Sequence, residues 1–61
     1  MMVKLSDGIV VNPEHVVSVT REYHGRFLLV KTVLGDVHEV SPLYGESIFK
    51  TEDRIAALLA G

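Results

Sequence analysis

The chain has 61 residues, a formal net charge of −2, 48% hydrophobic residues and no cysteine. This length suits a single small domain over residues 1–61, and the lack of cysteine excludes disulfides, thiolate metal sites and a cysteine nucleophile. The apolar content excludes a disordered chain, and the acidic balance disfavours a surface that neutralises nucleic-acid phosphates. Without a long apolar run or a signal-like start, we expect a cytoplasmic protein with no membrane association.

Five short strands are predicted in the first two thirds of the chain, where β-branched residues occur in runs separated by turn signals. The runs are residues 3–6, 9–12, 16–23, 26–33 and 37–41. Asp7-Gly8 predicts a type I′ turn and Gly35-Asp36 a type II′ turn, while His24-Gly25 predicts a third two-residue turn. Pro13 ends the second run because proline has no N–H to donate to a ladder. The pattern indicates an antiparallel meander.

One helix is predicted after Pro42, because Ile55, Leu58 and Leu59 recur at helical spacing. Either Ser47 or Thr51 can cap its N-terminus. We expect the adjacent acidic residues 52 and 53 in its first turn, where they stabilise the helix dipole. The predicted fold class is therefore α+β, mainly β, with about five strands followed by one C-terminal helix.

The predicted two-residue turns also fix a register for the sheet. They set Arg21 opposite Leu28 and Val19 opposite Val30, and they continue with Val17 opposite Thr32 and Leu34 opposite Val37. A single helix covers only one face of such a sheet. The apolar residues assigned to the other face are Val16, Phe27, Leu29, Val33 and Val40, with His38 beside them. This uncovered surplus predicts a homo-oligomer, with a dimer favoured.

Chemistry-bearing residues form no recognisable catalytic or metal motif. His15, His24 and His38 have spacings that match no local zinc motif, and no serine lies in a Gly-x-Ser-x-Gly elbow. The glycines are dispersed, which suits turns rather than a phosphate-binding loop. We therefore expect no enzyme activity, no metal and no cofactor.

A small basic and aromatic group is predicted on the third and fourth strands. Arg21 and Arg26 flank Tyr23, and Lys31 lies beyond them. Such a group can hold a phosphate or stack on a base. Carboxylates nearby in the sheet can instead neutralise it, in which case it is a solvated face with cross-strand pairs.

Several segments share their pattern with known families. They are Val11 to Val19 with Asn12 before Pro13, then His24-Gly25-Arg26, then Gly35, and then Val40-Ser41-Pro42 followed by Tyr44. This pattern resembles the C-terminal half of LytTR-type DNA-binding domains, although Pro42 stands where that family has an arginine. The opening Val3-Lys4-Leu5, with Gly8 and Asn12, is similar to the flagellar FlbD family of small proteins. Both resemblances imply a short β-meander, and the first implies DNA binding through loops.

Our functional prediction is a non-enzymatic regulatory or interaction protein of a bacterium or phage, which binds a protein partner through a sheet face or edge. Tyr23, Arg26 and Phe27 are the predicted anchors, because exposed aromatic and arginine side chains dominate interfaces. Two alternatives stay open. One is a DNA-binding regulator of degenerate LytTR type. The other is an oligomer that sequesters a small anionic, nucleotide-like ligand. The predicted nucleic-acid or anion contacts are Asn12, Arg21, Arg26 and Lys31.

Overall fold

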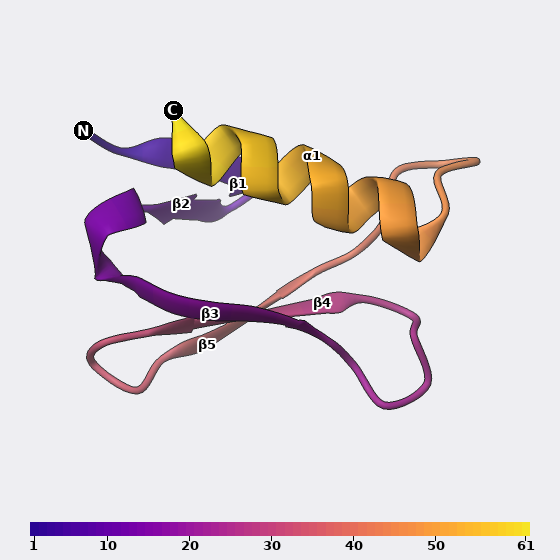
Figure 1. Cartoon of the computed structure of the whole chain (residues 1–61), viewed down its shortest axis with the longest axis horizontal. Coiled ribbons are helices and arrows are strands. Elements are labelled where there is room, and N and C mark those ends of the chain that lie inside the picture. Colours follow the sequence, from indigo (N-terminus) through magenta and orange to yellow (C-terminus); the bar gives the residue numbers. More distant parts are fainter.

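The computed structural model describes residues 1–61 and contains five strands, a short 3-10 helix and one α-helix. In chain order these are β1 (Val3–Ser6), β2 (Ile9–Val11), η1 (Pro13–His15), β3 (Val16–Arg21), β4 (Leu28–Thr32), β5 (Val37–Val40) and α1 (Ile48–Ala60). All strand pairs are antiparallel, in a two-stranded sheet β1–β2 and a three-stranded sheet β3–β4–β5 (Figure 1). The predicted α+β meander with one C-terminal helix is confirmed.

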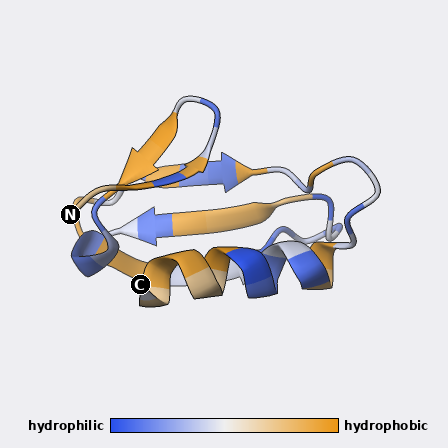
Figure 2. Cartoon of the chain, turned by 90° about the horizontal axis from the view of Figure 1, so that it is seen from above, coloured by the Kyte–Doolittle hydropathy of each residue, from blue (hydrophilic) through white to orange (hydrophobic).

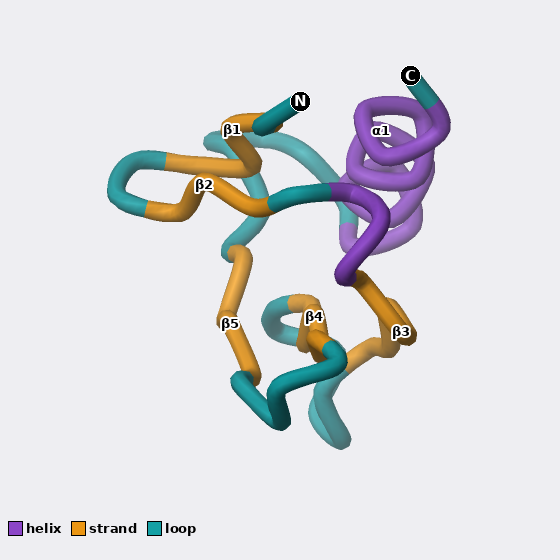
Figure 3. The backbone as a smooth tube through the Cα atoms, turned by 90° about the vertical axis from the view of Figure 1, so that its left-hand side faces the viewer, coloured by secondary structure: helices purple, strands orange, loops and turns teal.

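The elements form two layers. Helix α1 and the β1–β2 hairpin lie side by side over one face of the three-stranded sheet, and the other face of that sheet is open (Figure 3). The central strand β4 is largely hydrophobic (Figure 2). Buried apolar side chains from both layers meet between them; they are Leu5, Val11, Leu28, Val30, Val40 and Ile55. Burying a side chain of this kind contributes about 1.5–3 kcal/mol, so this six-residue core is the main stabilising feature of the fold.

The β3–β4 register is confirmed over most of its length. Arg21 lies opposite Leu28 and Val19 opposite Val30, as the sequence predicts. The predicted pairing of Val17 with Thr32 is wrong, because the register shifts between Val16 and Ser18 and sets Val16 opposite Thr32. Val17 is the extra residue of a β-bulge, and its side chain is exposed.

The β4–β5 register differs from the prediction. Gly35 N donates to Thr32 O at 3.0 Å, and Thr32 N donates to Asp36 O at 2.9 Å. The connection is therefore the three-residue loop 33–35, with Gly35 at φ 89°, and it is not a two-residue type II′ turn. Val37 consequently lies opposite Lys31 and not opposite Leu34. This odd shift in register moves every side chain of β5 to the opposite face of the sheet.

The new register relocates the predicted apolar surplus. Val40 is fully buried opposite Leu28, and Val16 packs against the core, so both lie on the covered face. Of the others assigned to the open face, Phe27 and Leu29 are half-buried and Val33 is exposed. The open face also contains polar side chains from all three strands, namely Ser18, Thr20, Lys31 and Glu39. The placement of the surplus on the open face is thus wrong for Val16 and Val40, whereas Phe27, Leu29 and Val33 lie outside the buried core.

The first hairpin and the helix start differ from the prediction in detail. Gly8 has φ 78° but no non-glycine residue has a positive φ, which excludes a type I′ turn at Asp7-Gly8. Ser47 is the N-cap of α1, and its hydroxyl accepts a hydrogen bond from Lys50 N at 3.2 Å. Because the helix begins at Ile48, the acidic residues 52 and 53 lie in the second turn and not in the first. Neither this helix nor η1 has the length and apolar content needed to cross a membrane.

Candidate functional site

Every aromatic residue of the chain lies near one end of the molecule. The two tyrosines and two phenylalanines come from three segments: Tyr23 and Phe27 from the β3–β4 loop, Tyr44 from the β5–α1 loop, and Phe49 from the first turn of α1. Figure 1 places both loops and the start of α1 at the same end of the long axis. We call the surface formed by Tyr23, Phe27, Tyr44 and Phe49 the aromatic end.

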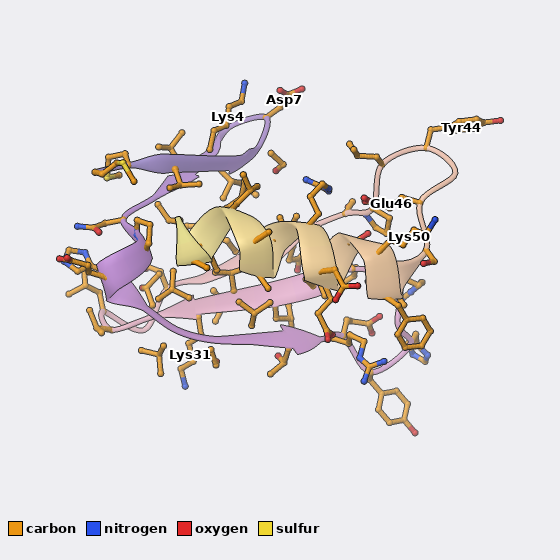
Figure 4. All side chains as sticks on the ribbon, turned by 45° about the horizontal axis from the view of Figure 1, so that its top comes forward. Lys4, Asp7, Lys31, Tyr44, Glu46 and Lys50 are labelled. Carbon is orange, nitrogen blue, oxygen red and sulfur yellow. The ribbon has the colours of Figure 1, made fainter.

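The aromatic end is open to solvent. Tyr23 is 94% exposed, Tyr44 fully exposed and Phe49 62% exposed, whereas Phe27 is half-buried. Figure 4 shows Tyr44 projecting from the tip of its loop, away from the body of the protein. Large aromatic side chains normally bury much of their apolar area, so their exposure at this end of the molecule makes it a candidate interaction site.

Glu46 fixes the loop that displays Tyr44. Its Oε1 accepts from Leu43 N at 3.0 Å, from the Thr51 hydroxyl at 2.7 Å and from Arg54 Nη2 at 3.1 Å, and its Oε2 accepts from Arg54 Nε at 3.0 Å. The Arg54 guanidinium, followed by the Leu43 N–H and the Thr51 hydroxyl, lowers the pKa of Glu46 from 4.5 to about 2. These bonds tie both ends of the loop to α1, so the loop presents its tip in a defined conformation.

Glu22 organises the loop that displays Tyr23 in a similar manner. Glu22 N donates to Phe27 O at 2.9 Å, Gly25 N donates to Glu22 O at 2.7 Å, and the Glu22 carboxylate lies 3.6 Å from Arg26 Nε. Desolvation raises the pKa of Glu22, but hydrogen bonds from the backbone N–H groups of His24 and Arg26, with the charges of these residues, outweigh it and lower the pKa overall. Both loops therefore combine an organising glutamate with an exposed tyrosine.

Arg21 connects the sheet to the helix beside these loops. Its guanidinium carbon lies 4.9 Å from the centroid of the Phe49 ring, and its Nε lies 3.3 Å from Glu52 Oε2. A cation–π contact at an exposed site contributes about 0.5–1 kcal/mol, and an exposed ion pair contributes no more than that. Arg21 thus orients the Phe49 ring and holds the start of α1 against the end of β3.

The structure brings together the predicted partner-binding residues and separates the predicted nucleic-acid or anion contacts. Tyr23, Arg26 and Phe27 share the β3–β4 loop. Asn12 instead caps η1 at the other end of the sheet, where its side chain accepts from Glu14 N at 3.0 Å. Lys31 lies on the open face of the sheet. Arg21 and Arg26 are both paired with carboxylates, so the four predicted contacts do not form one basic surface.

The three histidines lie in different surroundings. His24 packs edge-to-face on Tyr23 with ring centroids 5.1 Å apart. His15 and His38 line a groove of about 250 Å³ at the opposite end, together with the exposed side chains of Met2 and Leu34. No three histidine or carboxylate side chains are placed to hold a metal ion.

Sequence reasoning missed Tyr44 and Phe49 as residues of the aromatic end. Leu43 and Tyr44 follow Pro42 and precede Gly45, so they lie in a loop that cannot bury them. Two consecutive large apolar residues in such a loop are a usable signal for an exposed apolar surface. The role of Glu46 could not be found in this way, because its partner Arg54 is eight residues away in the helix.

The comparisons with known proteins give no match: no protein-family model, no curated protein and no solved structure is significantly similar to this chain. The resemblances to LytTR-type domains and to the FlbD family therefore stay predictions from the sequence.

Proposed function

We propose that this chain is a non-enzymatic protein-binding module and that the aromatic end is its contact surface. The observation that supports this proposal best is the pair of loops in which Glu22 and Glu46 fix the backbone while Tyr23 and Tyr44 stay exposed. A loop that is already ordered loses less conformational entropy on binding. Tyrosine adds a large apolar area and a hydroxyl at a small further cost, which is why it is frequent among interface hot spots.

The charges around the aromatic end indicate the chemistry of the partner. Arg26 pairs with Glu22, and Arg54 pairs with Glu46, so these groups are already neutralised within the chain. Lys50, in the first turn of α1, forms no salt bridge and is exposed (Figure 4). We therefore propose a partner surface that is mainly apolar and has a carboxylate placed to meet Lys50.

The test begins with a photo-crosslinking amino acid at position 44, introduced in the native host to capture the partner. The affinity of the purified partner is then measured for Tyr23→Ala, Arg26→Ala and Tyr44→Ala by calorimetry. Loss of a hot-spot side chain costs more than about 1.4 kcal/mol, so we expect each tyrosine variant to bind at least about tenfold more weakly.

The matched control is Leu34→Ala, because Leu34 is 81% exposed and lies in the β4–β5 loop at the opposite end of the sheet. We expect this variant to bind as tightly as the wild-type chain. Circular dichroism checks that all variants stay folded, which their exposure favours. Unchanged affinity in both tyrosine variants would disprove the aromatic end as the contact surface.

The same experiments address the predicted homo-oligomer. Light scattering coupled to size exclusion reports the mass of the purified chain at micromolar concentration. If the chain is a dimer that Tyr23→Ala or Tyr44→Ala dissociates, the partner is a second copy. If it is a monomer, the predicted homo-oligomer is wrong, and a different protein occupies the aromatic end.

A further inference from the structure

We propose that the free edge of β5 is a second binding site, which takes an extended peptide strand of a partner with alternating apolar residues and a basic residue. The site is distinct from the aromatic end and does not depend on it. It is formed by the backbone of Val37 and Glu39 and by a groove beside them.

The hydrogen-bond pattern of the hairpin identifies the free backbone groups. Thr32 N donates to Asp36 O at 2.9 Å, so residues 32 and 36 form a hydrogen-bonded pair. Such pairs alternate along an antiparallel ladder, and residues 30 and 38 and residues 28 and 40 are the next ones. The N–H and C=O groups of Val37 and Glu39 therefore point away from β4. Neither residue takes part in any of the backbone hydrogen bonds formed outside the helices and the strand ladders.

The edge of β5 is regular, whereas the opposite edge of the sheet is not. All four residues of β5 pair with β4 without a shift in register. On the other edge, β3 has the bulge at Val17, and Arg21 reaches over to Phe49 and Glu52 of α1. Bulges and covering elements are the usual means of blocking strand addition, whereas β5 has no bulge and no strand beside it in the plane of the sheet.

An open groove of about 510 Å³ borders this edge. Glu39 and Ser41 line it from the β5 side, and Leu5 and Ile9 line it from the β1–β2 hairpin. A strand added to β5 would direct alternate side chains toward this hairpin and toward the open face of the sheet. The lining on the hairpin side is mixed, because Lys4, Ser6 and Asp7 lie beside Leu5 and Ile9. Contact with Ile9 favours an apolar side chain of the peptide at that point.

The charges that line the groove favour a basic residue in the peptide. Lys4 pairs with Asp7 at 3.5 Å, and Arg54 pairs with Glu46 at 3.0 Å. Glu39 is the only charged residue of the lining that has no ion-pair partner. A lysine or arginine of the peptide that lies opposite Glu39 would form a cross-strand ion pair with its carboxylate.

A single strand suits this edge better than a second copy of the chain. In Figure 3 the tip of the β1–β2 hairpin extends outward beyond β5, above the edge. Antiparallel pairing of two β5 strands requires a two-fold axis perpendicular to the sheet, so the hairpin of each copy would extend over the β5 strand of the other copy. A separate peptide brings no hairpin and needs no such fit.

The test uses two peptides on the full-length ¹⁵N-labelled chain: acetyl-Thr-Val-Lys-Val-Thr-amide, and the same peptide with glutamate in place of lysine. We expect the amide protons of Val37 and Glu39 to shift downfield and to exchange more slowly with the lysine peptide, while those of His38 and Val40 change little. A cross-strand charge pair predicts that the lysine peptide binds about two- to fivefold more tightly than the glutamate peptide at low salt.

Two variants at position 39 separate the contribution of the backbone N–H to peptide binding from that of the side-chain charge. Glu39→Pro removes the outward N–H without removing a bond to β4, and we expect it to abolish binding. Glu39→Gln keeps the N–H but removes the charge, so we expect this variant to bind both peptides with equal affinity. It also tests the proposal if the proline variant does not fold.

Three results would overturn the proposal. The first is unshifted Val37 and Glu39 amides with either peptide at millimolar concentration. The second is wild-type binding by the proline variant. The third is slow exchange of both amides in a peptide-free dimer, which would mean that a second copy occupies the edge.

Discussion

Two buried threonines have opposite hydrogen-bonding situations, and replacing each by valine should change stability in opposite directions. Thr32 is 8% exposed, and its hydroxyl is the only buried side-chain polar group without a hydrogen-bond partner. Thr51 is fully buried, and its hydroxyl donates to Glu46 Oε1 at 2.7 Å. Valine has nearly the same shape as threonine, so neither substitution creates a cavity.

The two magnitudes follow from these contacts. A buried hydroxyl without a partner costs about 1–3 kcal/mol, so Thr32→Val should raise the free energy of unfolding by about 1 kcal/mol or more. A hydrogen bond to a charged group contributes about 1.5–3 kcal/mol, so Thr51→Val should lower the free energy of unfolding by about 2 kcal/mol. For a domain of this size, 1 kcal/mol corresponds to a shift in Tm of about 4–8 °C.

Urea unfolding followed by circular dichroism measures both changes, with the wild-type chain as reference. We expect the midpoint of Thr32→Val to rise and that of Thr51→Val to fall, with similar slopes for all three proteins. If Thr32→Val is destabilised as much as Thr51→Val, the Thr32 hydroxyl has a partner in solution, and the reasoning from its surroundings fails.

Two further predictions concern pH and backbone conformation. Because the pKa of Glu46 is lowered from 4.5 to about 2, its stabilising contribution is complete above pH 4.5 and is lost as the pH falls toward 2, so the difference in urea midpoint between wild type and Glu46→Gln should shrink over this window. A constant difference would contradict the role of the carboxylate. Gly35 has φ 89° and open space around the position of a Cβ, so Gly35→Ala should cost about 1–2 kcal/mol from backbone strain alone, measured by thermal unfolding. Gly35→Asn should cost less, because asparagine tolerates this conformation, and equal losses would argue against strain as the cause.

The register of the sheet shows where local sequence patterns fail. The structure has the predicted β3–β4 pairs at Arg21 and Val19. The predicted two-residue turn at His24-Gly25 is wrong, because Glu22 N donates to Phe27 O and Gly25 N donates to Glu22 O, so residues 23–26 form a four-residue loop. The β4–β5 register depends on whether Gly35 stands inside a two-residue turn or ends a three-residue loop. Both loops suit a glycine with positive φ, so sequence alone does not distinguish them. The burial of Val40 and Leu28 against the helix layer favours the three-residue loop.

The aromatic end was only partly predictable for a related reason. The pattern around Tyr23 and Arg26 marks a hairpin tip, and such a tip is exposed by its position. Tyr44 and Phe49 belong to a different part of the chain, and only the packing of α1 on the sheet brings them to the same end as Tyr23. The cation–π contact of Arg21 with Phe49 likewise joins residues that are distant in sequence.

The sequence by itself determined the fold class, the order of the elements, the approximate positions of the turns and the exposure of the β3–β4 loop, because these depend on local periodicity and on turn chemistry. The turn types and the loop lengths were not determined in this way. Tertiary packing decided which face β5 presents, where the apolar surplus is buried, and that the two glutamate-ordered loops lie at one end. These features depend on contacts between segments far apart in the chain. The core of this domain has only six buried apolar residues, so each contact between distant segments is a large share of the core. Such contacts therefore decide between strand registers that local sequence patterns do not distinguish.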